Sequence, residues 1–282
     1  MAELVPTSRD GWRAAPAGDV FNVLVGAARL GLRCSFISAV GSDGFAEMIF
    51  DALDREKIDS ACVVRDPVRQ NGIYTVESDG EGERRFHYWR RGSAAAGMMR
   101  TLDADTLFET IGRHRFLLLS GVTLAIVEER ELLLELARRV ADRVTIVLDT
   151  NYRPKLWRSG EEYRFWWEQL VPYGAILLPS WEDIGVVYGA DQVEPTLRRW
   201  GDGRALVVVK RGADGCGWIE RDHLMTMPAL VPEHIADTAG AGDAFNAGVL
   251  AALARDAAID DACMLGQQQA ARALAVRGAI EW

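Results

Sequence analysis

The segment with the clearest chemical potential is Asp237-Thr-Ala-Gly-Ala-Gly-Asp-Ala-Phe245, which leads into an apolar stretch that ends at Leu253. Gly240, Ala241 and Gly242 are small enough to let backbone amides approach an anion, and the start of a helix adds partial positive charge. A carboxylate at Asp243 would be stabilised by the same helix end and would lie within reach of that anion. The pattern suits phosphoryl transfer, in which amides neutralise charge on the transferred group and a carboxylate accepts the hydroxyl proton.

A simpler interpretation of this segment is also open. A helix that begins after flexible glycines, with Asp243 as a stabilising charge in its first turn, would have the same sequence. Two other phosphate-binding patterns are absent from the sequence, the Gly-x-x-x-x-Gly-Lys-[Ser/Thr] string and an opening Gly-x-Gly-x-x-Gly string. Their absence disfavours a P-loop or a dinucleotide-binding protein.

Polar residues also follow two apolar runs elsewhere in the chain. Asp149–Arg153 comes directly after the run ending at Leu148, and Lys210–Gly215 comes directly after the run ending at Val209. Open α/β sheets bind their ligands at the carboxyl ends of the strands, so both segments are candidates for a site. Each is only moderately specific, because an Asp after a strand is often a turn former and Lys210 could be a solvated strand end.

The elements that must position these residues are indicated by hydrophobic patterning. Short runs rich in aliphatic and β-branched residues are typical of buried parallel strands. Between them lie stretches with helical spacing, such as Val127–Val140, and the Ala-rich segment from Gly242 to about Ala275 also predicts helix. This alternation predicts an α/β fold with a parallel sheet covered on both faces. The predicted strands are Phe116–Ser120, Val144–Leu148, Ala175–Leu178 and Ala205–Val209.

One region departs from this alternation. Gly72–Ser78 and Arg85–Arg90 have strand propensity and are separated by the acidic, turn-forming residues 79–83, which predicts a β-hairpin. Its residues are aromatic and basic, unlike those of the aliphatic strands. Such a hairpin suits a lid or an edge that faces a ligand or a partner subunit. The alternative is a solvent-exposed excursion with no role in a site.

Composition excludes several classes of protein. The 282 residues include 32 Lys and Arg against 41 Asp and Glu, and the net charge of −9 argues against a nucleic-acid-binding protein. No stretch approaches 18 consecutive apolar residues, and the first residues do not resemble a signal peptide. The four cysteines have no metal-ligand spacing, which fits a reducing compartment. We expect a single domain over residues 1–282, cytoplasmic, with no membrane and no nucleic-acid partner.

Three segments carry a family resemblance. The segment Asp237–Phe245 resembles the C-terminal signature of the ribokinase-like (PfkB) sugar kinases. Gly18–Asn22 followed by Ala27–Gly31 resembles their N-terminal signature, and Val40–Gly44 resembles the turn after it. The matches run in order over essentially the whole chain. The resemblance implies a ribokinase-like three-layer sandwich, with a mostly parallel central sheet and small β-lid segments near residues 5–17 and 70–92, and an ATP-dependent sugar kinase.

Within this family, several stretches look most like the kinases that phosphorylate the acid sugar 2-keto-3-deoxygluconate at a terminal hydroxyl. A site for an acid sugar needs cations, and Arg90 and Arg153 can offer planar guanidinium groups to a carboxylate. A kinase for a neutral sugar such as fructose or ribose would not need both arginines. A catalytically impaired sugar- or nucleotide-binding protein is a further alternative. The stretches are His87–Ala95, Asp149–Trp157, Leu178–Asp183, Val208–Asp214 and Arg277–Ile280.

The resemblance implies a role for each matched residue. Asp243 is the expected general base, and Gly240, Ala241 and Gly242 form the expected anion hole. ATP brings Mg²⁺ with its phosphates, and Asp183 is a candidate to meet this ion through water. Asp237 is a candidate for holding a loop that binds a monovalent cation. A homodimer or higher homo-oligomer through the β lid is also expected. The acid-sugar pocket is expected to contain Gly18, Asn22, Tyr74, Tyr88, Arg90 and Arg153, and the nucleotide site Lys210, Gly212 and Gly215.

The chain departs from the family pattern in three places. Family members begin with a strand before the segment that Met1–Pro6 matches, so we expect the sheet to lack its first strand and its neighbours to have unpaired backbone groups. The Asn-x-x-Glu element reads Ser180-Trp-Glu-Asp183, which keeps an acid that is one carbon shorter. The paired glycines of the first signature read Ala17-Gly18.

Overall fold

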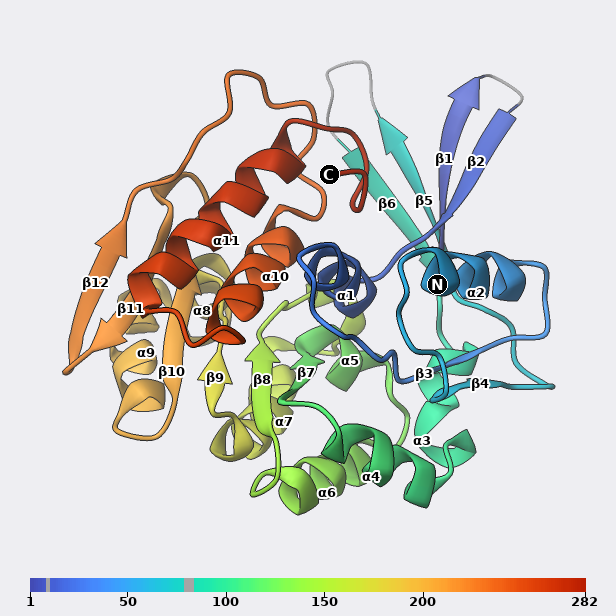
Figure 1. Cartoon of the computed structure of the whole chain (residues 1–282), viewed down its shortest axis with the longest axis horizontal. Helices are drawn as coiled ribbons and strands as arrows, with labels where there is room; N and C mark the ends of the chain where they lie inside the picture. Colours follow the sequence, from blue (N-terminus) through green and yellow to red (C-terminus); the bar gives the residue numbers. More distant parts are fainter. Residues whose placement is uncertain (9–10, 79–83) are drawn as a thin grey trace.

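The computed structural model describes residues 1–8, 11–78 and 84–282 (Figure 1). Its main sheet has six strands in the order β12-β11-β10-β9-β8-β7. The strands β7 to β10 run parallel, and β11 and β12 add an antiparallel hairpin at one edge. The strand bounds are β7 Phe116–Ser120, β8 Thr145–Asp149, β9 Ile176–Leu177, β10 Leu206–Lys210, β11 Cys216–Glu220 and β12 His223–Met227.

Helices cover both faces of this sheet, so the fold has three layers (Figure 1). Side chains along a strand alternate between the faces, as the pleat requires. On β8, Val147 packs in the core formed with α1, α2, α10 and α11, whereas Ile146 and Leu148 pack in the core formed with α4 and α6–α9. The helices are α1 Asp19–Arg29, α2 Phe45–Arg55, α3 Met98–Thr101, α4 Ala104–Gly112, α5 Gly121–Ile126, α6 Arg130–Val140, α7 Gly160–Leu170, α8 Trp181–Tyr188, α9 Val193–Gly201, α10 Ala241–Leu253 and α11 Ile259–Leu274.

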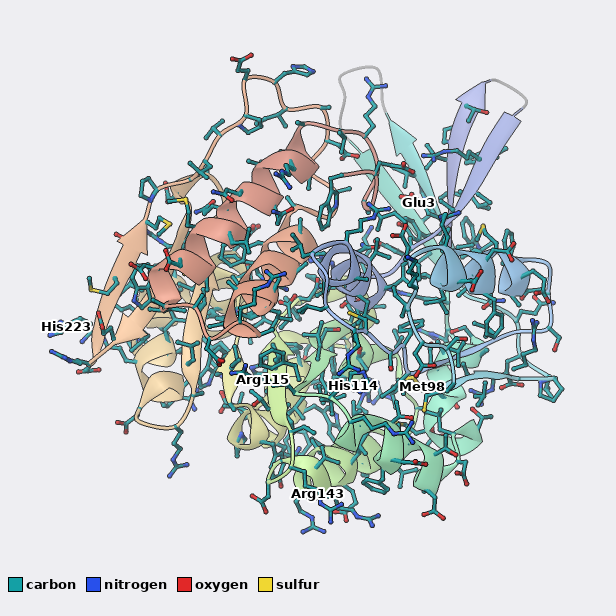
Figure 2. All side chains as sticks on the ribbon, viewed as in Figure 1. Glu3, Met98, His114, Arg115, Arg143 and His223 are labelled. Atoms are coloured by element: carbon teal, nitrogen blue, oxygen red, sulfur yellow. The ribbon has the colours of Figure 1, made fainter. Side chains whose placement is uncertain are left out.

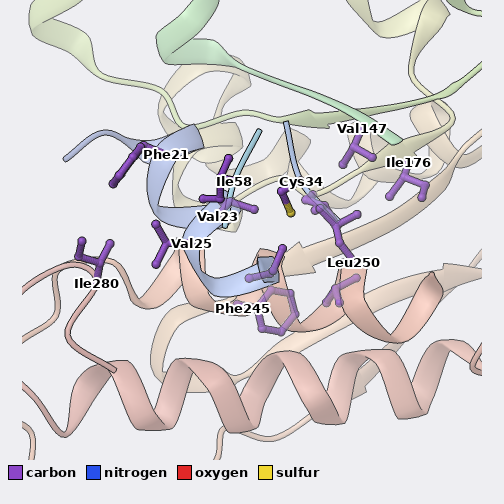
Figure 3. Close-up of a cluster of buried hydrophobic side chains, with 14 of the residues drawn as sticks. Phe21, Val23, Val25, Cys34, Ile58, Val147, Ile176, Phe245, Leu250 and Ile280 are labelled. Carbon is purple, nitrogen blue, oxygen red and sulfur yellow. The ribbon is translucent and has the colours of Figure 1, made fainter. Parts of the chain in front are cut away.

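Helix α10 is held by close packing on both sides. Phe21, Val23 and Val25 of α1 lie in one apolar cluster with Phe245 and Leu250 of α10 (Figure 3). On its other side, α10 approaches α11 where Gly248 faces Gly266. A Cβ on Gly248 would lie 2.7 Å from the carbonyl oxygen of Leu265, so the two helices could not pack this closely with a larger residue. This packing fixes the position of the α10 N-terminus.

A second sheet of four strands, in the order β2-β1-β5-β6, stands beside the main body (Figure 1). It is the predicted lid, and the hairpin of β5 and β6 is confirmed by an antiparallel register from Ile73↔Trp89 to Ser78↔Arg84. The predicted turn at residues 79–83 lies outside the described residues. The strands are β1 Ala2–Ser8, β2 Gly11–Pro16, β5 Ile73–Ser78 and β6 Arg84–Trp89.

A small parallel pair, β3 Ser38–Val40 and β4 Val63–Arg65, is separate from both sheets. In the described part of the chain, β3 pairs only with β4, and β7 pairs only with β8. A large cavity is lined by residues of both β3 and β7. Two strand edges therefore face this cavity. The missing first strand stays a prediction.

The predicted α/β class and the four predicted strands are confirmed, with each strand shifted by at most one residue at its start. The predicted helix over Val127–Val140 begins three residues later, at Arg130. The C-terminal helical segment is two helices, separated by residues 254–258. No helix among the described residues is long and apolar enough to cross a membrane. Short 3₁₀ helices are η1 Ala94–Gly97, η2 Pro154–Leu156, η3 Val171–Tyr173, η4 Ala190–Gln192 and η5 Gly212–Asp214.

Candidate active site

The start of α10 forms the centre of the candidate site. Gly240 is the N-cap with φ of 75°, and a Cβ at this position would lie 2.4 Å from the carbonyl oxygen of Ala279. Only glycine suits both the left-handed conformation and this contact. The first amides of a helix have no acceptor within the helix, and here the helix begins beside two cavities. Of the three residues predicted for the anion hole, Gly240 lines both cavities and Gly242 lines one, whereas Ala241 lines neither.

Asp243 lies in the first turn of α10 and accepts a hydrogen bond of 2.8 Å from the Asn22 Nδ2 atom of α1. Burial raises the pKa of Asp243 from 3.8 to about 8. The nearby carboxyls of Asp19 and Asp149 also raise this pKa, whereas the bond from Asn22 and the charge of Lys210 lower it. A carboxyl group that titrates near neutrality is suited to accept a proton from a hydroxyl.

Two cavities meet at Asp243. The first has a volume of about 1520 Å³ and extends toward the lid; the second has a volume of about 990 Å³ and extends toward β10 and the segment before α10. A group transferred between ligands in the two cavities would pass the N-terminus of α10. The residues that line both cavities are Asn151, Arg153, Ala239, Gly240 and Asp243.

The lid supplies the aromatic wall of the first cavity. Tyr74 and Tyr88 are paired across β5 and β6 and both line the cavity, with ring centroids 5.5 Å apart. The Tyr74 hydroxyl donates a bond of 2.9 Å to the buried carboxylate of Glu3, which lies where the lid meets the body (Figure 2). The bond ties β5 to β1. The lid wall of the cavity is therefore braced by its own hydrogen bond.

Arginine side chains give the first cavity positive charge. Arg90 follows β6, lines the cavity, and stacks its guanidinium over the Tyr88 ring at 4.3 Å from the centroid. Its Nε atom is buried and has no hydrogen-bond partner among the described residues. Arg91 is exposed and lines neither cavity. Of the two adjacent arginines, Arg90 is thus the one that lines the cavity.

The remaining predicted pocket residues lie around the same cavity. Gly18 and Asn22 line it from the start of α1, and Arg153 lines both cavities from the loop after β8. Arg153 donates a bond of 3.2 Å to the carbonyl oxygen of Tyr152 and is otherwise exposed. The structure therefore brings together all six residues predicted for the acid-sugar pocket.

The structure places only some of the residues predicted for the nucleotide site at the second cavity. Gly212 lines the second cavity, but Gly215 does not. Gly215 closes the turn between β10 and β11 with φ of 89°, where a Cβ would lie 2.1 Å from the carbonyl oxygen of Met227. Lys210 lines the cavity but turns its ammonium inward, where it donates to Asp149, Leu178 and Asn246.

Both predicted metal-associated carboxylates line the second cavity and are held by the protein. Asp183 Oδ2 accepts bonds from the Thr150 hydroxyl at 2.8 Å and from the Tyr152 amide at 3.1 Å, and burial raises its pKa. Asp237 accepts from the amides of Ala239 and Gly278, each at 2.9 Å, and so joins the segment before α10 to the C-terminal segment. Among the described residues, no group of three or more His, Cys, Asp or Glu side chains could hold a metal ion.

Two site residues were not predicted. Asp19 lines the first cavity and accepts a 3.1 Å bond from Asn151 Nδ2, and burial raises its pKa. Asn246, three residues after Asp243 on α10, is fully buried. The signal for Asp19 was present, since it adjoins Gly18 in the N-terminal signature. Asn246 stood in a segment interpreted only as an apolar helix, and its polar side chain there was the signal for a buried contact.

Comparison with known proteins identifies the family. The chain matches the model of the pfkB family carbohydrate kinases over residues 5–282 and belongs to that family, as the sequence resemblance predicted. It is similar to the 2-dehydro-3-deoxygluconokinases of Escherichia coli K12, with 35% identity covering 93% of this chain and 89% of the relative, and of Dickeya dadantii, with 33% identity covering 93% and 88%.

Solved structures agree with the ribokinase-like fold. The PfkB protein from Polaromonas sp. JS666 has a TM-score of 0.82 and 28% identity, covering 97% of this chain and 92% of that protein. The fructokinase from Vibrio cholerae O395, in its fructose-, ADP- and calcium-bound form, has a TM-score of 0.85 and 25% identity, covering 99% and 92%. The predicted fold and the predicted class of enzyme, a carbohydrate kinase, are confirmed.

Proposed function

We propose that this kinase transfers the γ-phosphoryl group of ATP to the terminal hydroxyl of 2-keto-3-deoxygluconate or a closely related acid sugar. The observation that carries the proposal is the meeting of two cavities at Asp243 and the α10 N-terminus. The sugar occupies the cavity beneath the lid, and the nucleotide occupies the cavity beside β10. The similarity of this kinase to 2-dehydro-3-deoxygluconokinases at 32–35% identity supports the choice of sugar.

The proposed mechanism uses groups already held in place. Asp243 removes the proton of the attacking hydroxyl, and Asn22 fixes the orientation of its carboxylate. The first amides of α10 stabilise the charge that develops on the transferred phosphoryl group. Mg²⁺ bound to ATP would neutralise the phosphates, and Asp183 would meet it through water. Because the described residues include no group of three or more His, Cys, Asp or Glu side chains that could hold the ion, the nucleotide phosphates would supply most of the ligands.

A coupled assay tests the substrate. ADP release would be followed by NADH oxidation, with Mg-ATP and a panel of 2-keto-3-deoxy acid sugars, fructose and ribose. Turnover confined to the acid sugars is the expected result. Turnover of fructose or ribose would overturn the acid-sugar assignment but would still show a sugar kinase. No ADP release with any sugar would favour a catalytically impaired binding protein.

Replacing Arg90 tests the charge argument. A guanidinium with a buried, unpartnered Nε gains a charge-assisted hydrogen bond when a carboxylate enters the cavity. Losing such a bond costs about 1.5–3 kcal/mol, so Arg90→Ala should raise KM for the acid sugar roughly 10- to 100-fold. KM for ATP should stay within a few-fold. Arg91→Ala is the matched control, and an unchanged KM for the sugar in Arg90→Ala would refute the carboxylate role.

We also propose self-association through the outer face of the lid. The register places Trp12 of β2 and Trp89 of β6 on the face opposite Tyr74 and Tyr88, and both are more than half exposed, at 52% and 58%. Exposed tryptophans on one face are typical of an interface. Sedimentation should show a homo-oligomer that Trp12→Ser with Trp89→Ser converts to monomer. A monomeric unmodified chain at micromolar concentration would contradict this.

The cytoplasmic location stays a prediction.

A further inference from the structure

The side chains of Lys210, Asp149 and Asn246 form a closed ring of hydrogen bonds beside the candidate site. The Lys210 ammonium donates to Asp149 Oδ1 at 2.9 Å, to the Leu178 carbonyl oxygen at 2.7 Å and to Asn246 Oδ1 at 3.1 Å. An ammonium has three donors, and these bonds use all of them. Asn246 Nδ2 closes the ring with a bond of 2.7 Å to Asp149 Oδ2. The ammonium has no donor left for a phosphate in this arrangement.

The ring joins three elements that carry the site. Asp149 ends β8, Lys210 ends β10, and Asn246 lies one turn after Asp243 on α10. The two charged side chains of the ring, Lys210 and Asp149, are 15% and 6% exposed, so both charges are largely shielded from water and balance each other.

The ring also reaches the sugar side of the site. Asp149 Oδ1 accepts from the Asn151 amide at 3.2 Å, and Asn151 Nδ2 in turn donates to Asp19 in the first cavity. Asn151 has a φ of 31°, in the left-handed region that asparagine tolerates better than most residues. The bonds that begin at Lys210 therefore help to set the loop that lines both cavities.

We propose that Lys210 is a positioning residue, whose ammonium balances Asp149 and fixes α10 and the loop after β8, and that it is no ligand of the nucleotide. The part of this inference that concerns activity rests on the proposed function, since it takes Asp243 as the base. The structural part does not, because the ring exists without any ligand. The two parts are therefore tested by separate measurements.

The thermal test compares Lys210→Met with the double variant Lys210→Met/Asp149→Asn. The single variant leaves a buried carboxylate without its cation, which should lower Tm by roughly 10 °C. The double variant leaves no buried charge and should recover at least half of that loss. Exposed Lys57→Met is the control and should leave Tm unchanged. If Lys210→Met does not fold but the double variant does, charge balance is supported; a double variant no more stable than the single one would overturn the proposal.

Nucleotide binding and the pH profile separate positioning from direct contact. Calorimetry with ADP should give a Kd within about threefold of the unmodified enzyme for the folded double variant; a loss of tenfold or more would make Lys210 a phosphate ligand and overturn the proposal. The charged groups around Asp243 are Asp19 on α1, Asp149 at the end of β8, Lys210 at the end of β10 and Arg153 beside the cavities.

Once a sugar that the enzyme phosphorylates is known, the pH dependence can be measured. The acid limb of kcat/KM should move to higher pH in Lys210→Met and should return toward its original pH in the double variant. The reason is that Lys210 lowers the pKa of Asp243 and Asp149 raises it. An unmoved limb would contradict the positioning role. If no sugar is turned over, the proposed function fails, and the Tm and ADP measurements still decide the role of Lys210.

Discussion

Replacing Asp243 by Asn should lower kcat by roughly 10²- to 10⁴-fold, the usual loss when a general base is removed. Asparagine has the same shape and can still bond with Asn22, but it cannot accept the hydroxyl proton at any accessible pH. KM for ATP should stay within a few-fold, because the amides at the start of α10 are unchanged. Steady-state kinetics with the acid sugar and Mg-ATP would measure both constants.

The control for this variant is an acidic residue in the same kind of position away from the cavities. Asp260 lies in the first turn of α11 and is exposed, so Asp260→Asn should keep kcat within twofold. Retention of kcat within a few-fold in Asp243→Asn would show that another group is the base.

Thermal unfolding separates lost chemistry from lost structure in Asp243→Asn. The pKa of Asp243 is raised in the folded protein, so the folded state binds a proton more tightly than the unfolded chain does between about pH 4 and pH 8. The stability that this group contributes is present at low pH and is lost as the pH rises through about 8. Asparagine carries no charge to bury. The variant should therefore be at least as stable as the unmodified enzyme at pH 8.

The parts of the fold that the sequence predicted are those with local signals. β7 to β10 are aliphatic runs buried on both faces, and their composition alone marks them as strands. The start of α10 was predictable because Gly240 serves a left-handed conformation that larger residues rarely adopt, and the helix begins directly after it. The hairpin of β5 and β6 was predictable from its turn residues, although the turn itself lies outside the described residues.

What could not be predicted depends on contacts between distant residues. Lys210 stands at a strand end, where a lysine usually points to solvent or to a ligand. Its inward direction is set by Asp149 and Asn246, which are 61 and 36 positions away in the sequence. The edge hairpin of β11 and β12 was missed as well, because β12 is largely exposed and has little hydrophobic patterning.

The two cavities also depend partly on local sequence signals and partly on contacts between distant residues. Each lining segment has a local signal, but the meeting of the cavities at Asp243 results from α1 packing against α10. That packing places Asn22 within 2.8 Å of a carboxylate 221 positions later. A sequence motif can therefore name the proposed base, whereas its hydrogen-bond partner and its raised pKa come from tertiary structure.

The raised pKa of Asp243 predicts a steep dependence of activity on pH. The base must be ionised to accept the hydroxyl proton, and its pKa in the free enzyme is about 8. The acid limb of kcat/KM, which reports the free enzyme, should therefore have its midpoint near that pH. Below it, kcat/KM should fall about tenfold per pH unit. Initial rates from pH 5.5 to 9.5 in buffers of constant ionic strength would measure the limb.

Two variants should move this limb in opposite directions, which a general effect of pH on folding would not do. Asn22→Leu removes the hydrogen bond that favours the carboxylate, so the midpoint should rise. Asp19→Asn removes a neighbouring negative charge that raises the pKa, so the midpoint should fall. Tm measured across the same pH range gives the folded fraction for each variant. A limb that is flat between pH 6 and 9, or that moves the same way in both variants, would mean that the observed proton belongs to a group other than Asp243.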